Sequence, residues 1–248
     1  MVMQETSNRR IVIGDVHGHY NGLMGLLEAI APGKEDEIYF IGDLIDRGPQ
    51  SSKVVEFVKQ NATGCILGNH EQMLIDVVSG GAMAAQVQQS WLYSGGYATI
   101  TSYPDSTIPE EHLEWMKKLP IYLDLGDVLL VHAGVDPRMP FEAQTSEQLC
   151  WIRDEFHSME APYFSDKLIV IGHTITFTLP GVTPGKLAQG QGWIDIDTGA
   201  YHPKSGWLTG FDITNNQVYQ FNVHQQRSRI LTLNEAVTSI EPTKIKRR

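Results

Sequence analysis

Several apolar runs in this sequence end at a glycine that is followed by a residue able to bind a metal ion or a proton. In "GNHEQM", residues 68–73, Asn69 and His70 come directly after the apolar run "CIL". A polar side chain at the end of a buried strand costs free energy unless a partner binds it. The same succession recurs in "IVIGDVHG", "YFIGDLIDRG" and "LIVIGHT", while in "LLVHAG" the histidine follows the apolar run directly and the glycine comes after it. Together these stretches supply the candidate residues Asp15, His17, Asp43, Asp46, Arg47, Asn69, His70, His132 and His173.

Each of these residues has an ordinary structural explanation when it is taken alone. An aspartate after a strand is most often a helix cap or a turn residue. The set is harder to explain in this way, because capping has no use for histidines at three separate strand ends. A binuclear metal site does need carboxylates, neutral imidazoles and an amide oxygen. The sequence therefore predicts two divalent metal ions. Oxygen and imidazole ligands without thiolate point to Mn²⁺, Fe or Zn²⁺, of which we favour Mn²⁺.

Strands and helices have to bring these residues together. In the first part of the chain, strands are expected at 9–14, 37–42 and 63–68, and helices at 20–30 and 51–61. This alternation predicts a mostly parallel sheet, in which ligands lie beyond the carboxyl ends of the strands. Residues 70–118 have a mainly helical pattern, with breaks at residues 80–81 and 95–96. Later strands, expected to be largely antiparallel, are predicted at 121–126, 127–134, 167–174, 192–199, 206–213 and 217–223.

Length, charge and cysteine content limit the class of protein. The 248 residues, 42% of them hydrophobic, suffice for one domain, which we place at 1–238, followed by a short basic tail at 239–248. The net charge of −10 argues against nucleic-acid binding, and no apolar run approaches the length of a membrane span. Cys65 and Cys150 lie in apolar surroundings, and the N-terminus lacks an apolar signal sequence. Both features favour a cytoplasmic protein with reduced thiols.

The motifs "GDVHG", "GDLIDRG", "GNHE", "HAG" and "GHT" resemble those of the metallophosphoesterase superfamily. More closely, they resemble the phosphoprotein phosphatase family of serine/threonine phosphatases, in its compact bacterial and phage form. With "DIDTG" at 195–199, the resemblance covers about four fifths of the chain. It implies a calcineurin-like metallophosphoesterase fold of the α/β class (α+β by some schemes), in which a two-sheet β-sandwich is flanked by helices.

The resemblance also implies a role for each motif residue. His70 would protonate the leaving oxygen, with Asp46 orienting it, and Arg47 would hold the phosphate. A second phosphate-binding arginine is expected after "HAG", for which we prefer Arg153 to Arg138. The metal ligands would be Asp15, His17, Asp43, Asn69, His132 and His173, with Asp43 bridging the two ions.

The expected reaction is hydrolysis of a phosphate ester by in-line attack of a metal-bridging hydroxide, because two cations lower the pKa of a shared water and arginine forks match phosphate oxygens. A protein phosphatase acting on phosphorylated proteins or peptides is the main hypothesis, with small phosphoesters left open. One alternative is a hydrolase of symmetrical dinucleoside tetraphosphates, and another is a catalytically silent metal- and phosphate-binding module. The dinucleotide hydrolases carry a non-acidic residue where this chain has Asp46, so Asp46 favours phosphomonoesters.

The remaining aromatic and histidine residues are expected to be structural. An aromatic cluster between 91 and 103 could cap the site, but packing in the core is the favoured role. Its members are Trp91, Tyr93, Tyr97 and Tyr103. The histidines outside the motifs, expected to be structural or exposed, are His19, His112, His157, His202 and His224.

Overall fold

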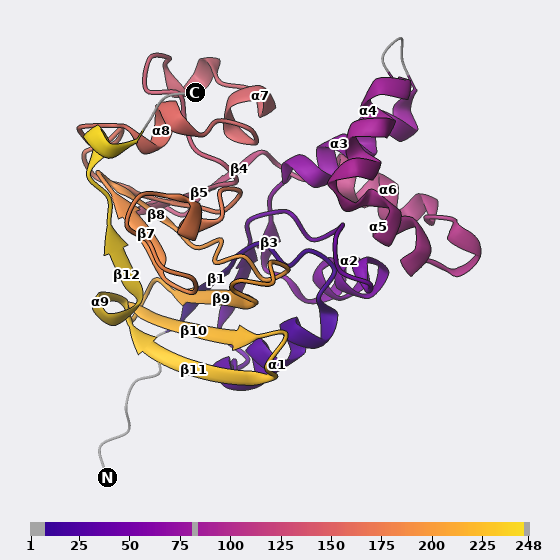
Figure 1. The fold of residues 1–248 in the computed structure, drawn as a ribbon, viewed down its shortest axis with the longest axis horizontal. Coiled ribbons are helices and arrows are strands. Elements are labelled where there is room, and N and C mark those ends of the chain that lie inside the picture. The colour runs from indigo at the N-terminus through magenta and orange to yellow at the C-terminus, as the bar shows by residue number, and fades with distance from the viewer. Residues whose placement is uncertain (1–7, 81–83, 246–248) are drawn as a thin grey trace.

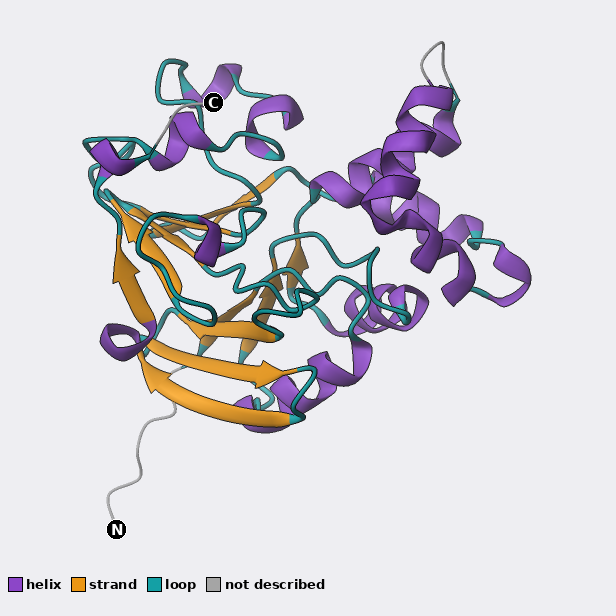
Figure 2. Ribbon diagram, viewed as in Figure 1, coloured by secondary structure: helices purple, strands orange, loops and turns teal. Residues whose placement is uncertain are grey.

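The computed structural model describes residues 8–80 and 84–245, which fold into two six-stranded sheets with helices on both sides (Figures 1 and 2). The order of the first sheet is β11-β10-β9-β1-β2-β3, and that of the second is β12-β7-β8-β6-β5-β4. The strands are β1 (Arg10–Ile13), β2 (Glu37–Phe40), β3 (Gly64–Cys65), β4 (Tyr122–Asp124), β5 (Val128–Val131), β6 (Leu168–Ile171), β7 (Leu187–Gly190), β8 (Trp193–Asp195), β9 (Trp207–Asp212), β10 (Gln217–Asn222), β11 (Arg227–Thr232) and β12 (Val237–Ser239).

The first sheet begins with the predicted parallel unit. Strands β1, β2 and β3 are parallel, and helices α1 (Tyr20–Ile30) and α2 (Ser51–Asn61) occupy the predicted ranges. The apolar residues of β1 are buried because the strand is covered on both faces, as is usual for parallel strands. Strand β9 then pairs antiparallel with β1 and continues into β10 and β11.

The second sheet corrects one prediction. Its central strands β5, β6 and β8 are parallel, so the expectation of a largely antiparallel second half is wrong here. The reason is that a long crossover, which contains α7 (Ser146–Leu149) and α8 (Asp154–His157), separates β5 from β6. Three strands, β7, β11 and β12, have no counterpart among the predicted ranges.

Three apolar clusters hold the layers together. One cluster lies between the two sheets. There Val12 and Ile41, from the side of the first sheet, pack with Val170 of the second sheet. Another lies under α1 and α2 and includes Leu23 and Val54, while a third, on the far face of the second sheet, includes Phe156. The order helix, sheet, sheet, helix confirms the predicted fold class.

Residues 69–80 and 84–117 form a helical arm on one side of the sheets (Figure 1). The predicted breaks are confirmed at Gly80, which ends α3, and at Gly95, whose φ of 109° interrupts a π-helix; Gly81 lies outside the described residues. Trp91 and Tyr103 are buried as expected, but Tyr93 and Tyr97 are 95% and 69% exposed. The elements are α3 (Asn69–Ser79), α4 (Ala84–Trp91), η1 (Leu92–Gly96), α5 (Tyr97–Ser102), η2 (Pro104–Ser106) and α6 (Glu110–Lys117).

The rest of the chain adds short elements and scattered charge. In the described residues, Ile240 is buried and Ile245 packs on an apolar cluster, while the last three basic residues of the predicted tail lie outside the description. Cys65 and Cys150 are buried free thiols.

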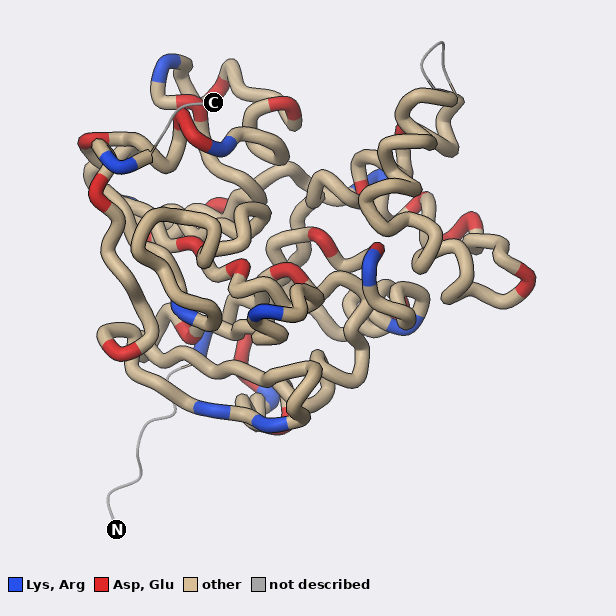
Figure 3. The backbone as a smooth tube through the Cα atoms, viewed as in Figure 1, with Lys and Arg blue, Asp and Glu red and all other residues tan. Residues whose placement is uncertain are grey.

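Basic positions form no continuous stripe in Figure 3. No helix among the described residues is both long enough and apolar enough to span a membrane. The short helices are η3 (Phe141–Ala143), η4 (Thr176–Thr178), α9 (Leu233–Ala236) and η5 (Pro242–Lys244).

Candidate metal centre and active site

The loops that follow strands β1, β2, β3, β5 and β6 carry the motif residues to one place. Glycines allow these loops to approach one another closely. A Cβ atom on Gly68 would lie 2.3 Å from the Asp43 backbone nitrogen and carboxylate, and one on Gly172 would lie 2.1 Å from Asp15 Oδ1. Any larger residue at either position would push a candidate ligand away, which explains why glycine precedes the polar residues in these motifs.

The backbone of the site is strained at five functional positions. Positive φ values at non-glycine residues are uncommon and cost on the order of 1 kcal/mol each, so they persist where the surrounding structure enforces them. Among the described residues, ten non-glycine positions have positive φ, and half of them are candidate site residues. These five are His17, Asp43, Asp46, Arg47 and His173, with φ values of 45°, 49°, 72°, 67° and 68°.

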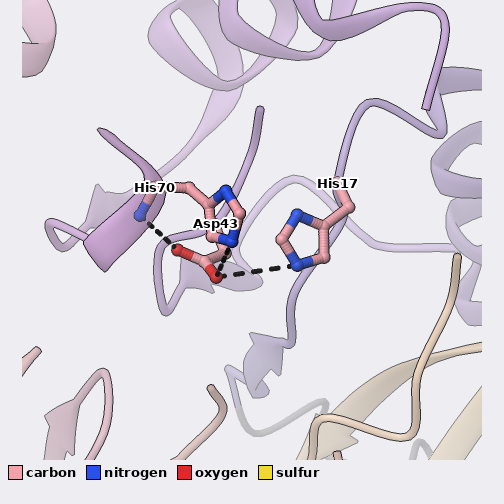
Figure 4. Close-up of side chains that lie close together, drawn as sticks. All are labelled: His17, Asp43 and His70. Carbon is pink, nitrogen blue, oxygen red and sulfur yellow. Dashed lines mark hydrogen bonds and ion pairs between the residues drawn. The ribbon is translucent and has the colours of Figure 1, made fainter. Parts of the chain in front are cut away.

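The carboxylate of Asp43 lies at the centre of the site. Its Oδ2 atom is 3.6 Å from His17 Nε2 and 3.8 Å from His70 Nε2 (Figure 4). Its Oδ1 atom is 3.3 Å from His132 Nε2 and accepts the backbone N–H of His70. Asp43 is therefore shared by two clusters of ligand-type atoms, one with His17 and His70 and the other with His132 and His173. This placement agrees with a bridging role.

Hydrogen bonds on the outer side of the imidazoles show which atoms face the cluster. His17 Nδ1 is 2.9 Å from the carbonyl of Ile45, and His132 Nδ1 is 2.7 Å from the carbonyl of Ile41. A carbonyl oxygen accepts, so each Nδ1 donates its proton and leaves a lone pair on Nε2. Burial also lowers the pKa of both histidines, which favours the neutral imidazole that metals bind.

Acceptor atoms therefore face one another across the site. The lone pair of His132 Nε2 lies 3.0 Å from Asn69 Oδ1 as well as near Asp43. His173 Nδ1 lies 2.8 Å from the same amide oxygen. Converging acceptors repel one another unless a cation lies between them, so this donor set fits a metal ion.

Asp15 adds a further acceptor of the same kind. Its Oδ1 atom is buried without a hydrogen-bond partner among the described residues, although its Oδ2 atom accepts the backbone N–H of His173. Burial, together with the charges of Asp197 and Asp43, raises the pKa of Asp15 well above its ordinary value. Leaving a buried polar atom unpaired costs about 1–3 kcal/mol, and a bound cation would remove that cost.

Glu71 connects two loops of the site, although no role was predicted for it. Its fully buried carboxylate accepts backbone N–H groups of Asp43, Leu44, Ile45 and Gly68, at 2.8, 2.8, 3.2 and 3.1 Å. It therefore ties the loop of Asp43 to the loop that carries Asn69. Burial, followed by the charge of Asp43, raises the pKa of Glu71 to about 7. The signal was present in "GNHE", where an acidic residue follows the candidate histidine.

His70 and Asp46 form the pair that was expected to deliver a proton. His70 Nδ1 is 2.5 Å from Asp46 Oδ2, and the other contacts of this carboxylate are the indole N–H of Trp91 and the hydroxyl of Thr99. Burial opposes a charged imidazole, but the charge of Asp43 and the hydrogen bond to Asp46 outweigh it and raise the pKa of His70. Its Nε2 atom lies 3.3 Å from Arg47 Nη2 and is directed towards the cavity.

A cavity of about 290 Å³ opens over the centre, and both predicted arginines line it. The Arg47 guanidinium stacks on the Tyr201 ring at 4.1 Å. Arg153 Nη1 donates to Thr174 Oγ1 at 2.9 Å. Arg138, the alternative to Arg153, is an exposed partner of Asp136 and does not line this cavity.

Asp197 and Tyr201 also line the cavity, and the sequence assigned neither of them a role. Burial raises the pKa of Asp197 to about 6 and that of Tyr201 to about 12. Asp197 follows β8 as the other motif residues follow their strands, so the same strand-end rule could have found it. Tyr201 lies in an irregular segment without a recognisable spacing.

The backbone of Arg153 is anchored by a buried histidine, which yields a pH prediction. His157 Nδ1 is 2.7 Å from the Arg153 carbonyl, and its Nε2 is 3.7 Å from Asp195 Oδ2. Burial lowers the pKa of His157 from 6.5 to about 4. The buried site accepts the neutral imidazole of His157 and disfavours the charged one. The stability that depends on neutral His157 is therefore fully present above pH 6.5 and is lost as the pH falls towards 4. Between pH 7 and pH 5, the free energy of unfolding of the native protein should fall by about 2 kcal/mol relative to that of His157→Gln.

Urea unfolding of both proteins at pH 7, 6 and 5 measures this difference. Groups that do not contact position 157 titrate alike in both proteins and cancel, so the comparison reports His157 together with its neighbour Asp195. A difference that stays constant over the three pH values would show that His157 has the same pKa in the folded and unfolded states.

Two mixed sheets, with carboxylates and imidazoles at the strand ends and two arginines in the cavity, are typical of metal-dependent phosphoester hydrolases. The model of the calcineurin-like phosphoesterase family matches residues 9–224. The chain belongs to this family, whose membership implies divalent metal ions.

Eight similar proteins share one enzyme name. A Vibrio campbellii protein called symmetrical bis(5'-nucleosyl)-tetraphosphatase is 25% identical over 75% of this chain and 70% of its own length. Seven further proteins with that name, one of them from Dechloromonas aromatica, are 30–35% identical, and the matched part of this chain spans 42–53% of their length.

Solved structures agree on the fold. A structure provisionally described as a diadenosine tetraphosphatase has a TM-score of 0.63 at 21% identity, over 92% of this chain and 95% of its own. A protein-tyrosine phosphatase of a psychrophilic Shewanella has a TM-score of 0.55 at 19% identity, over 91% and 80%. At these identities the likeness shows the fold alone.

The comparisons overturn the protein phosphatase hypothesis and, with it, the expectation of phosphorylated proteins as partners, because the matching sequences are named as tetraphosphatases. The error came from the weight given to Asp46. The structure shows why this residue is a poor guide to substrate. Its side chain is fully buried and is bound by His70, Trp91 and Thr99, so it does not reach the molecule being cleaved.

Proposed function

We propose that this protein hydrolyses symmetrical dinucleoside tetraphosphates, such as diadenosine tetraphosphate, into two nucleoside diphosphates. The observation that carries the proposal is the shared name of its sequence relatives. The geometry of the site supports a phosphoester hydrolase but does not distinguish between the groups that carry the phosphate. The cavity of about 290 Å³ has room for the reacting phosphates, and the nucleosides of such a substrate would extend beyond it.

We further propose that two divalent ions, with Mn²⁺ favoured, are held by the motif carboxylates, imidazoles and amide around Asp43. When bound, such ions neutralise phosphate oxygens and lower the pKa of a coordinated water. The acceptor atoms that converge on Asn69 and Asp43 support this assignment. The proposed ligands are Asp15, His17, Asp43, Asn69, His132 and His173.

The remaining residues of the site then have separate tasks. Asp46 accepts the Nδ1 proton of His70 and fixes the imidazole so that Nε2 can deliver a proton to the leaving phosphate oxygen. Arg47, held by its stacking on Tyr201, and Arg153, held by Thr174, present guanidinium donors to the phosphate chain.

Replacing Arg153 with alanine should weaken substrate binding more than turnover. A hydrogen bond to a charged group contributes about 1.5–3 kcal/mol, so KM should rise about 10- to 100-fold with a smaller change in kcat. Steady-state kinetics of Arg153→Ala measure this, and Arg138→Ala is the matched control because Arg138 lies outside the cavity. The roles would be exchanged if the Arg138 variant lost affinity and the Arg153 variant did not.

The substrate proposal is tested by a direct comparison of three substrates. Metal-stripped protein is assayed with and without added Mn²⁺ on diadenosine tetraphosphate, a phosphothreonine peptide and an aryl phosphate. Mn²⁺-dependent cleavage with a clear preference for the dinucleotide is expected. Cleavage of the other two substrates with the dinucleotide spared would overturn the proposal, while binding of metal without any cleavage would identify a binding module.

A further inference from the structure

One wall of the cavity is aromatic and partly open to solvent. Trp151 lines the cavity, yet 40% of its surface is exposed, which places the indole at the rim. A cavity of about 290 Å³ is at the lower limit for ligand pockets, so much of a dinucleotide must extend over that rim. The rim residues therefore meet the nucleoside part of such a substrate.

The indole of Trp151 is fixed in place despite its exposure. Its Nε1–H donates to Gln72 Oε1 at 3.0 Å, and Gln72 Nε2 donates to Ser146 Oγ at 3.1 Å. Gln72 lies on α3 and Ser146 on α7, so one amide side chain joins two elements and the indole. An exposed tryptophan gains little for folding from such a clamp, whereas a rigid aromatic surface is useful for recognition.

We propose that Trp151 is the platform on which one nucleobase of the substrate stacks, and that Gln72 is the residue that positions it. The inference rests on the proposed function and adds to it the recognition of the base. Arg153 is two residues further along the chain and reaches the same cavity, and the indole lies 6.4 Å from the ring of His173. The phosphate-binding groups and the aromatic surface thus border the same cavity, so a nucleotide can reach both, with its ribose between the phosphate and the base.

Other aromatic residues near the cavity are less suitable. One face of the Tyr201 ring is covered by the Arg47 guanidinium. Tyr93 and Tyr97 are more exposed than Trp151 but are not among the residues that line the cavity. Trp151 thus combines a cavity position, an exposed surface and a fixed orientation.

The test compares two ligands that differ by a nucleoside. Binding of α,β-methylene-ADP and of methylenediphosphonate, neither of which is hydrolysed at the bridging carbon, is measured by calorimetry on the full-length protein at one Mn²⁺ concentration. Base stacking on an aromatic residue predicts that the native protein binds the nucleotide about 5- to 150-fold more tightly than the diphosphonate. Trp151→Ala should reduce nucleotide affinity to the level of the diphosphonate, and Trp151→Phe should retain most of it.

Two more variants distinguish the loss of base stacking on Trp151 from general effects of a substitution on the fold. Gln72→Ala should lower nucleotide affinity by less than Trp151→Ala and leave diphosphonate binding unchanged. Tyr122→Ala is the matched control, because Tyr122 is 41% exposed but does not line the cavity, and it should bind both ligands as the native protein does. Circular dichroism of each variant confirms that it is folded.

The outcomes distinguish this inference from the function on which it rests. Equal affinity of the native protein for both ligands, or an unchanged nucleotide affinity in Trp151→Ala, would overturn the platform even if diadenosine tetraphosphate is hydrolysed. A loss of phosphopeptide binding in Trp151→Ala without any loss of nucleotide binding would also overturn it. Stacking on Trp151 without hydrolysis of the dinucleotide would support the platform and reject the proposed function.

Discussion

Replacing His70 with asparagine is expected to lower kcat by about 10²-fold while leaving the metal content unchanged. General acid–base catalysis contributes about 10²–10⁴-fold. The lower end applies here because the leaving group is a nucleoside diphosphate, whose terminal phosphate has a pKa near 6 and needs less protonation than an alkoxide. An alkyl phosphate, if cleaved, should therefore suffer a larger loss than the dinucleotide.

The measurement combines steady-state kinetics with metal analysis by mass spectrometry. His112→Asn is a suitable control, since His112 is also a buried histidine, 2.7 Å from the Glu56 carboxylate, but lies outside the cavity. His70 Nε2 is close enough to Asp43, at 3.8 Å, for a ligand role to be considered. Loss of metal from His70→Asn would assign His70 to the metal centre and remove it as the proton donor.

Replacing Asp43 with asparagine is expected to remove most of the bound metal and with it nearly all activity. Asp43 is shared by both ligand clusters, and the surrounding histidines, although burial opposes them, hold its pKa below the usual range. It is therefore the ionised carboxylate common to both proposed metal positions. An amide of the same size keeps the shape but supplies no negative charge between two cations.

Metal content of Asp43→Asn after dialysis against a fixed Mn²⁺ concentration measures the effect. Asp212→Asn is the control, because Asp212 is equally buried but accepts hydrogen bonds from Thr214 and Asn215 at the end of β9. The control should retain its metal. Full occupancy in the Asp43 variant would disprove a bridging role for this carboxylate.

Local sequence predicted the first half of the fold well. The ranges of α1 and α2 agree with the structure because their helical periodicity is strong and turn residues end them. Local sequence did not predict β11, because its arginines and alternating exposure give a weak apolar pattern. It also did not predict β7 and β12, which are short and form by pairing with each other in the sheet. The direction of β5, β6 and β8 depends on long crossovers, which the short strands themselves do not reveal.

The residues brought together at the site were largely predictable from the strand-end rule, because parallel strands deliver their carboxyl ends to one edge. Tyr201 and Trp151 were not predicted, since their places depend on packing between distant segments. The substrate was predicted wrongly because the identity of one residue, Asp46, was taken to separate phosphomonoesterases from dinucleotide hydrolases. Its buried carboxylate, which contacts His70, Trp91 and Thr99, acts through these neighbours and carries no information about the substrate.

Product analysis tests most directly whether a metal-dependent site in this protein cleaves a dinucleoside tetraphosphate symmetrically. Metal-stripped protein is incubated with diadenosine tetraphosphate, with and without Mn²⁺, and the nucleotides are separated by chromatography at early times. We expect ADP as the sole initial product, formed at an appreciable rate when the metal is added. Formation of AMP with ATP, or equal rates without any metal, would contradict it.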